Sequence, residues 1–452
     1  MAKTKSTYVC QSCGTHAAKW IGHCTACGEW NSYIEEIISS DTARSSSSAK
    51  SFSSRPKKLK EISIEDLKRL RTGNEEFDRV VGGGIVPGSV LLIGGEPGIG
   101  KSTLVLQLTL SMNNVKTLYI SGEESQQQLK MRAERLGGNN DELFFISENS
   151  LEANMKHLDE ILPDLVVVDS IQTLVTDKAE SSAGSVTQIR ECTAELLHFA
   201  KQHHVPVMLI GHINKEGHLA GPKVLEHMVD TVLQFEGDQN HLYRILRSKK
   251  NRFGSCDELG IYEMQQGGLR GVSNPSEMLL ANRDMPMSGN AISASMEGQR
   301  PILIQTQALV STAAYGTPQR STTGFDGRRL NMLLAVLEKR AGFRLAIKDV
   351  FLNMAGGLKV TDPAIDLAVM AAILSSDKNE SISQNTCFAG EVGLSGEIRP
   401  VSRIEQRISE AARLGFDKII IPERNLKNND LKKAKIQIIT VKHIGELINK
   451  IL

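Results

Sequence analysis

The chain of 452 residues lacks any apolar run long enough to cross a membrane, which takes about 18 consecutive apolar residues. The positive charge after Met1 is not followed by the apolar stretch of a secretory signal peptide, so none is expected. An excess of charge of one sign is also missing, because 53 Lys and Arg balance 52 Asp and Glu. That balance neither favours nor excludes a nucleic-acid partner, since charge can gather locally.

A disulfide framework is missing as well. Four of the seven cysteines lie between residues 10 and 27, and the other three, Cys192, Cys256 and Cys387, are far apart. This spacing is not that of a small disulfide-bonded secreted protein, and a reducing compartment fits it best. We therefore expect a cytoplasmic protein that does not interact with membranes.

Composition divides the chain into four segments, where length alone predicts about three domains. We expect a Cys₄ zinc finger at 1–34, a flexible Ser-rich linker at 35–58, a nucleotide-binding α/β domain at 59–275 and a second α/β domain at 276–452. Apolar runs alternate with helical patterns in the third segment, which predicts a mainly parallel sheet. Its predicted strands are Val90–Ile93, Thr117–Ile120, Leu165–Val168 and Val207–Ile210, followed by hairpin strands Tyr243–Leu246 and Ile261–Met264 with a turn at Gly267–Gly268.

A phosphate-binding loop is the most informative motif. Residues 95–102 fit the pattern G-x-x-x-x-G-K-[ST] between an apolar strand and a Leu-rich helical stretch. Glycines let backbone N–H groups turn toward phosphate oxygens, Lys101 is expected to reach the β- and γ-phosphates, and Ser102 to hold Mg²⁺. The predicted ATP-binding residues are Gly95, Glu96, Pro97, Gly98, Ile99, Gly100, Lys101, Ser102 and Thr103.

Polar residues at the ends of three other predicted strands complete an ATPase site. Asp169 ends an apolar strand, as a Walker-B aspartate does, and is expected beside Mg²⁺. Glu123 and Glu124 follow the strand at Thr117–Ile120, and either could orient and deprotonate the attacking water; we favour Glu123. The other is then an ordinary carboxylate at a helix N-terminus. His212 ends a further strand and is either a sensor of the γ-phosphate or a surface histidine.

The amino-terminal cysteines predict a structural zinc site. Two C-x-x-C pairs with ten residues between them supply four thiolates, which closes a tetrahedral shell. The expected ligands are Cys10, Cys13, Cys24 and Cys27, with His16 and His23 as nearby substitutes. Trp20 and Trp30, the only tryptophans, are expected to pack this small unit; stacking on bases of single-stranded nucleic acid is the alternative.

Taken together, the motifs resemble one family over essentially the whole chain. The Cys₄ finger, the phosphate loop, Tyr-Ile-Ser-Gly-Glu-Glu-Ser, Val-Val-Asp-Ser-Ile-Gln-Thr, Gly-His-Ile-Asn-Lys-Glu-Gly and Lys-Asn-Arg-Phe-Gly occur in the order typical of the RadA family of bacterial DNA repair proteins, also called Sms. The resemblance implies a RecA-like core close to that of hexameric DnaB-type helicases. It also implies a DNA-stimulated ATPase that extends heteroduplex by branch migration on single-stranded or branched DNA, with the RecA recombinase as partner.

The same resemblance assigns further residues. The family motif is Lys250, Asn251, Arg252, Phe253 and Gly254, and its cations Lys250 and Arg252 either reach a neighbouring subunit's γ-phosphate or contact a DNA phosphate. In RecA-like rings two loops line the DNA channel, and here they correspond to 176–190 and 214–223. Their small residues favour mobile loops. The candidate DNA contacts in or near them are Lys178, Arg190, Lys215 and Lys223.

The carboxyl-terminal segment resembles the proteolytic domain of Lon from about Gly324 onward. By that register Ala364 occupies the position of the serine nucleophile and Glu405 that of the catalytic lysine, so no Ser–Lys dyad remains. Asp362 followed by Pro363 predicts the start of a helix, and the stretch 364–375 is apolar enough to be buried. We expect an inactive scaffold that assembles the ring, with duplex DNA as a further candidate ligand.

The sequence suggests three candidate functions. An ATP-driven DNA motor is favoured because the phosphate loop, Asp169 and Glu123 together suit hydrolysis. A nucleotide-switched, non-motor regulator of repair is the alternative. The third, a peptidase of the Lon type, is disfavoured by the lost dyad.

Overall fold

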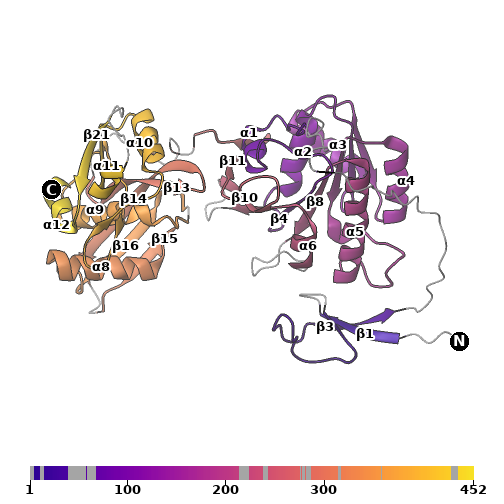
Figure 1. The fold of residues 1–452 in the computed structure, drawn as a ribbon, viewed down its shortest axis with the longest axis horizontal. Coiled ribbons are helices and arrows are strands. Elements are labelled where there is room, and N and C mark those ends of the chain that lie inside the picture. The colour runs from indigo at the N-terminus through magenta and orange to yellow at the C-terminus, as the bar shows by residue number, and fades with distance from the viewer. Residues whose placement is uncertain are drawn as a thin grey trace. The chain divides into compact units, whose positions relative to one another are not determined.

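The computed structural model describes residues 5–10, 15–38, 58, 68–212, 223–237, 243–274, 276, 280, 287–313, 317–357, 359–428 and 436–451. The chain divides into two compact units, one of Met1–Gly237 with Tyr243–Gly271 and one of Asp238–Leu242 with Val272–Leu452 (Figure 1). Within these described ranges, no helix is both long and apolar enough to cross a membrane.

The amino-terminal finger is a small antiparallel sheet. Its strands are β1 (Lys5–Cys10), β2 (His16–Ala17) and β3 (Tyr33–Ile38), in the order β2-β1-β3. β3 pairs with β1 along its whole length, from Tyr33 opposite Cys10 to Ile38 opposite Lys5. The finger therefore extends to Ile38, beyond the boundary predicted at residue 34, because β1 supplies a full-length partner for these residues. Most of the predicted linker lies outside the described residues.

A nine-stranded sheet forms the centre of the first unit, in the order β12-β11-β10-β9-β4-β8-β7-β5-β6. The strands from β9 to β6 in this order are parallel, and β10, β11 and β12 continue the sheet as antiparallel hairpins. The strands are β4 (Val90–Gly95), β5 (Thr117–Ser121), β6 (Leu143–Ser147), β7 (Leu165–Asp169), β8 (Val207–His212), β9 (Thr231–Gly237), β10 (Tyr243–Asn251), β11 (Leu259–Gln265) and β12 (Gly268–Gly271). The predicted strands and hairpins are confirmed within these bounds.

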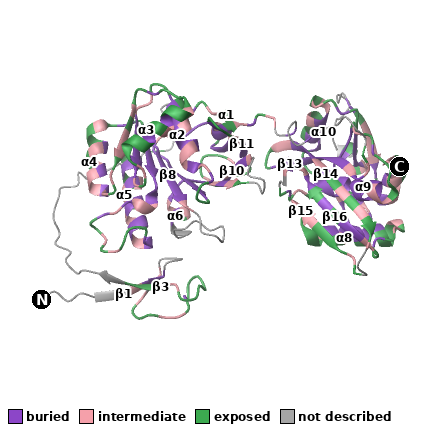
Figure 2. Ribbon diagram, turned by 180° about the vertical axis from the view of Figure 1, so that it is seen from behind, coloured by how far each residue is buried: buried purple, intermediate pink, exposed green. Residues whose placement is uncertain are grey.

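Helices cover both faces of this sheet (Figures 1 and 2). They are α1 (Glu75–Val80), α2 (Lys101–Ser111), α3 (Gln126–Leu136), α4 (Leu151–Ile161), α5 (Val186–His203) and α6 (Lys223–Met228). Successive strand residues enter opposite cores: Leu91 and Ile93 of β4 pack with α1, α2 and α3, whereas Val90 and Leu92 pack with α4 and α5. Strands buried on both faces explain the continuous apolar runs of the sequence.

The second unit contains a seven-stranded sheet in the order β15-β16-β14-β13-β17-β20-β21 and a separate pair β18-β19. The strands are β13 (Asn290–Glu297), β14 (Arg300–Thr312), β15 (Arg320–Thr323), β16 (Lys348–Met354), β17 (Thr386–Phe388), β18 (Glu391–Val392), β19 (Ile398–Arg399), β20 (Lys418–Pro422) and β21 (Gln437–Val441). The helices are α8 (Gly327–Ala341), α9 (Asp366–Lys378), α10 (Ile404–Arg413), α11 (Glu423–Asn428) and α12 (Ile444–Ile451).

Helix α9 is the buried helix predicted from its composition. Asp362 accepts a hydrogen bond from the backbone N–H of Ala364 at 3.1 Å, and Pro363 opens a short 3₁₀ turn that runs into α9. From Asp366 to Ser375 every residue is buried, with α9 packed on β13 and β14. The predicted helix start is confirmed, and the predicted α/β fold class holds for both units.

Candidate functional site

The loop between β4 and α2 has a backbone that only glycine accommodates easily. Gly98 and Gly100 have φ angles of 76° and 110°. A Cβ atom on Gly95 would lie 2.6 Å from the carbonyl oxygen of Phe235, which leaves no room for a side chain. α2 begins directly at Lys101, so the first N–H groups of the helix face the loop. This cradle fits a phosphate group.

Lys101 is buried within the loop. Its Nζ donates to the carbonyl oxygens of Gly95 at 2.8 Å and Glu96 at 2.9 Å, and lies 3.3 Å from Nδ1 of His212. Burial lowers the pKa of Lys101 to about 8, although the carboxylates of Asp169 and Glu123 oppose that shift. A buried cation surrounded by these groups is suited to bind an anion such as a phosphate.

Asp169 ends β7 and is 6% exposed. Its Oδ2 accepts a hydrogen bond from the hydroxyl of Tyr119 at 2.8 Å, and Ser102 also donates to this carboxylate. Burial raises the pKa of Asp169, and the two hydrogen bonds partly offset that rise. A carboxylate beside a serine hydroxyl is the donor set that Mg²⁺ takes in phosphate-loop sites, so the residues fit the predicted Mg²⁺ site.

The two adjacent glutamates have different partners. Oε1 of Glu123 accepts from the hydroxyl of Ser170 at 2.8 Å and lies 3.2 Å from Nε2 of His212. Burial alone would raise the pKa of Glu123, but these hydrogen bonds and the positive charge of Lys101 outweigh it and hold the pKa below its ordinary value. Glu124 instead forms an ion pair with Arg132, and burial raises its pKa. The geometry favours Glu123 as the residue that faces the phosphate loop.

His212 connects the two sides of the site. A lysine ammonium group can only donate, so Nδ1 of His212 accepts from Lys101. The ring proton of the neutral imidazole then sits on Nε2, from which it is donated to Glu123. The sequence placed His212 at a strand end but left open whether it was a surface residue; the structure puts it between Lys101 and Glu123.

Three of the four predicted zinc ligands lie together in the finger. The Sγ atoms of Cys10, Cys24 and Cys27 are within 4.8 Å of one another, and Cys13 lies outside the described residues. Tyr33 donates from its hydroxyl to Sγ of Cys24 at 3.4 Å. Clustered thiolates with a supporting hydrogen bond fit a structural zinc ion.

The prediction for the tryptophans is wrong. Trp20 and Trp30 are 53% and 72% exposed, because a unit this small buries its apolar surface around the cysteines and Tyr33 instead. The ring of His23 contacts Trp30 with 4.8 Å between centroids, and the described thiol cluster does not include this histidine.

The family motif lies near the amino ends of β4 and β9, whereas the phosphate loop lies at their carboxyl ends. β9 pairs with β4, with Thr231 opposite Leu91 and Phe235 opposite Gly95. Asn251 is opposite Thr231 on the other side of β9, so the motif is roughly 13 Å along the strands from Gly95.

Within the motif the two cations differ. Nζ of Lys250 donates to the carbonyl oxygens of Glu226 and His227, in the last turn of helix α6, and of Val229, which follows the helix. Burial and the nearby Arg252 lower the pKa of Lys250. Nη1 of Arg252 lies 3.6 Å from Oδ1 of Asp230, and its side chain is 56% exposed. Arg252 is therefore the more accessible of the two.

Hydrogen bonds hold the start of the first predicted DNA loop, 176–190, against helix α5. The amide of Gln188 donates to the carbonyl oxygens of Thr176, Ala179 and Ser181, which fixes the start of the loop onto α5. Gln188 is itself buried at the helix start, so these hydrogen bonds are shielded from solvent; mobility of the loop remains a prediction.

The candidate DNA contacts have these positions. Lys178 pairs with Glu195, and Arg190 pairs with Glu191. Lys215 lies outside the described residues, as does the rest of the second loop up to residue 222. Lys223 begins α6, and nothing is described of its side chain.

The resemblance to Lon assigned Ala364 and Glu405 to the two positions of a Ser–Lys dyad, and neither side chain is a hydroxyl or an amine. Ala364 is fully buried and Glu405 is exposed on α10. Nearby, Nη1 of Arg407 donates to Oδ2 of Asp362 at 2.6 Å and to the carbonyl oxygen of Ala294 at 2.6 Å, and Arg407 is 1% exposed.

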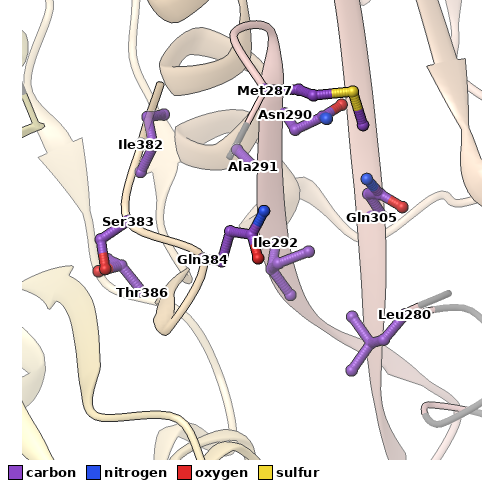
Figure 3. Close-up of a pocket in the computed structure, with 10 residues that line it drawn as sticks. All are labelled: Leu280, Met287, Asn290, Ala291, Ile292, Gln305, Ile382, Ser383, Gln384 and Thr386. Carbon is purple, nitrogen blue, oxygen red and sulfur yellow. The ribbon is translucent and has the colours of Figure 1, made fainter. Parts of the chain in front are cut away.

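A pocket in the same unit lies between β13, β14 and the segment before β17 (Figure 3). Its side chains are apolar, hydroxyl or amide groups, among them Asn290, Gln305 and Gln384. The lining residues include no ionisable side chain, so they supply no acid or base.

Three structural residues were not found from the sequence: Tyr119, Asp230 and Arg407. Asp230 accepts from the backbone N–H of Val90 at 3.0 Å and from Lys201 at 2.7 Å, which joins the motif to the start of β4. Each is a polar side chain within an apolar or mixed stretch, and only the fold reveals its partner. The signals in the sequence were polarity at a position expected to be buried and, for Tyr119, its place at the start of the segment Tyr-Ile-Ser-Gly-Glu-Glu-Ser.

Comparison with known proteins gives three matching family models. Residues 54–218 match an AAA domain, residues 8–35 a rubredoxin metal binding domain, and residues 307–425 the subunit ChlI of Mg-chelatase. Over the whole chain the protein is similar to the DNA repair protein RadA of Bacillus subtilis, with 50% identity over 453 residues and 99% of each chain covered. The RadA proteins of Listeria monocytogenes and Streptococcus pyogenes are 49% and 47% identical over 456 and 452 residues, with 100% of each chain covered. The resemblance predicted from the motifs is confirmed.

Proposed function

Because the chain belongs to the RadA family of DNA repair proteins, we propose that it is a DNA-dependent ATPase of the helicase type. It acts on recombination intermediates and promotes branch migration during RecA-mediated strand exchange in the cytoplasm. One observation carries this proposal: Lys101, Asp169 and Glu123 converge at the carboxyl end of one parallel sheet, around a glycine loop suited to phosphate.

In this proposal each residue of the site has a separate task. Backbone N–H groups of 95–103 bind the phosphates, and Lys101 exchanges its carbonyl partners for the β- and γ-phosphates. Ser102 and Asp169 would hold Mg²⁺, and the bound ion would neutralise charge on the phosphate oxygens. Glu123 orients the attacking water and accepts its proton. His212, in contact with both Lys101 and Glu123, responds when the γ-phosphate leaves.

The motif serves a neighbouring subunit in the proposed ring. Arg252 lies at the far end of the sheet from its own phosphate loop, so it cannot contribute to that site. In a homo-oligomer, which we propose to be a hexamer as in DnaB-type helicases, an exposed arginine there faces the next subunit's nucleotide. Contact with a DNA phosphate is the competing assignment for Arg252 and Lys250. Lys178, Arg190, Lys215 and Lys223 remain candidates for contacts with single-stranded or branched DNA.

The finger contributes a structural zinc site held by Cys10, Cys13, Cys24 and Cys27. Zinc binding and folding are coupled in so small a unit, because few other residues are buried in it. The exposed Trp20 and Trp30 give this finger a surface for a partner protein or for unpaired bases.

A non-motor regulator is the second candidate, and one observation favours it. The described cations of the first predicted DNA loop, Lys178 and Arg190, are already paired with carboxylates of α5. A protein that changes shape with nucleotide and recruits other repair proteins has no need of free cations at that position. Such a protein would hydrolyse ATP slowly and unwind nothing.

The proposal is tested by ATP-dependent unwinding of a forked DNA, comparing the wild type with Lys101→Ala. We expect unwinding by the wild type alone, because the variant lacks the cation that contacts the phosphates. DNA-stimulated hydrolysis without unwinding, in the presence and absence of RecA, would instead support the regulator. Hydrolysis by Lys101→Ala at the wild-type rate would refute the site.

A further inference from the structure

A buried tyrosine contacts the carboxylate of the proposed Mg²⁺ site. The hydroxyl of Tyr119 donates to Oδ2 of Asp169 at 2.8 Å, and Tyr119 is 0% exposed. Tyr119 lies on β5, where Ser121 is directly opposite Asp169 of β7. Side chains two residues apart lie on the same face of a strand. The side chain of Tyr119 therefore lies on the same face of the sheet as that of Ser121, near the carboxyl end of β5.

The ring of Tyr119 is held by apolar packing and its hydroxyl by Asp169. The ring contacts Phe145 of β6 with 5.7 Å between centroids and belongs to the core shared with Leu91, Ile93 and Val167. A carboxylate at the end of a strand can adopt several rotamers, and a hydrogen bond to one oxygen selects among them. With Oδ2 engaged by Tyr119, Asp169 presents a fixed orientation to Ser102, which also donates to it.

We propose that Tyr119 is a positioning residue that fixes Asp169 for binding of the nucleotide-associated divalent cation. This inference rests on the proposed function, because it assumes that Asp169 and Ser102 hold Mg²⁺. Hydrogen-bond partners of a metal ligand typically change metal affinity by about 10–100-fold when removed. Tyr119 touches neither nucleotide nor metal and acts only through Asp169.

The test is Tyr119→Phe, which keeps the ring and removes the hydroxyl. Mn²⁺ serves as the probe, and its binding to the full-length protein with ADP is followed by electron paramagnetic resonance. We expect the dissociation constant for Mn²⁺ to rise about 10–100-fold. Affinity for a fluorescent ATP analogue in excess chelator should remain within about twofold of the wild type, because the phosphate loop is unchanged.

Tyr262→Phe is the matched control. Tyr262 is also a buried tyrosine of this sheet, but its hydroxyl donates to Oδ1 of Asn74 at 3.2 Å. We expect this variant to lose stability without a change in Mn²⁺ binding. Replacing Tyr119 by 4-aminophenylalanine, which retains a donor at the same position, should restore the affinity for Mn²⁺. If Tyr119→Phe does not fold, 4-fluorophenylalanine at position 119 fills the space of the hydroxyl without donating.

The inference is overturned if the variant that lacks the donor binds Mn²⁺ within twofold of the wild type, or if Tyr262→Phe loses as much affinity. It is also overturned if the effect of Tyr119→Phe persists in an Asp169→Asn background, since it would then not pass through Asp169. Wild-type protein in which Mn²⁺ does not strengthen nucleotide binding would instead refute the proposed function. The two failures are therefore distinguishable.

Discussion

The imidazole Nε2 of His212 lies 3.2 Å from Oε1 of Glu123, although 89 residues separate them in the sequence. The contact exists because β8 and β5 end at the same edge of the sheet, with β7 between them. It distinguishes Glu123 from Glu124, whose carboxylate pairs with Arg132 instead.

That distinction predicts different outcomes for two neighbouring substitutions. Glu123→Gln should lower the rate of ATP hydrolysis by about 10²–10⁴-fold while ATP still binds, because an amide cannot accept the proton of water. Glu124→Gln is the matched control and should keep hydrolysis within a few-fold. Single-turnover hydrolysis measures both, and equal losses would mean that the structure does not identify the base.

Nucleotide affinity should depend on pH through Lys101. Burial lowers the pKa of Lys101 from 10.5 to about 8, so the free protein loses this charge as the pH rises above 8. Phosphate favours the charged form, so ATP binding should weaken above about pH 8 and take up a proton there. Calorimetry in buffers of different ionisation enthalpy measures that uptake. Lys101→Arg, which stays charged, should abolish it; proton uptake unchanged in this variant would exclude Lys101 as the group.

The same shift makes a prediction for stability. Between about pH 8 and 10.5 the unfolded chain binds more protons at Lys101 than the folded chain does. The free energy of unfolding should therefore gain a contribution that rises with pH through this window. Chemical denaturation of wild type and Lys101→Met at several pH values tests it, and parallel profiles for the two proteins would contradict it.

Zinc content should depend on the four cysteines of the finger and not on the other cysteines of the chain. Cys24→Ser should lose the metal and unfold the finger, because a hydroxyl is a poor zinc ligand and the buried thiol of Cys24 also accepts from Tyr33. Cys256→Ser is the control: it removes an exposed thiol outside the finger and should retain zinc. Metal analysis of the purified proteins decides, and full zinc content in Cys24→Ser would show that the ligand set is wrong.

Action of Arg252 on a neighbouring subunit predicts complementation. Lys101→Ala and Arg252→Ala should each hydrolyse ATP poorly, by about 10³-fold or more for loss of an arginine finger. Mixed rings contain interfaces that pair an intact Lys101 with an intact Arg252, so mixing should restore part of the rate. No recovery on mixing, together with a weaker salt dependence of DNA binding by Arg252→Ala, would assign Arg252 to DNA.

The sequence was sufficient for the elements that have a local signal. The phosphate loop, the apolar strands and the Asp362–Pro363 helix start each depend on neighbouring residues, and all three were predicted. Glu123 was favoured over Glu124, but the sequence could not show what distinguishes them, because both follow the same strand and only their distant partners, His212 and Arg132, differ.

Other features depend on contacts between distant segments. Nothing local shows that the hairpins after Tyr243 continue the sheet of the phosphate loop, since that depends on pairing of β9 with β4. The tryptophans were predicted to pack this small unit, but its described core consists of Cys10, Cys24 and Tyr33 with a few partly buried neighbours, and the tryptophan side chains are exposed. The tie between Gln188 and the loop at Thr176 is likewise a tertiary contact that small loop residues do not reveal.

Strand β9 contacts the phosphate loop near one end and the family motif near the other. At one end the backbone of Phe235 lies against Gly95 of the phosphate loop, and at the other Asp230, just before the strand, pairs with Arg252. β9 is hydrogen-bonded to β4 on one side and to β10 on the other, so it connects these two places directly within the sheet. The phosphate loop and the family motif therefore border the two ends of one β-strand, so a single element of secondary structure lies between the residues proposed to bind nucleotide and Arg252.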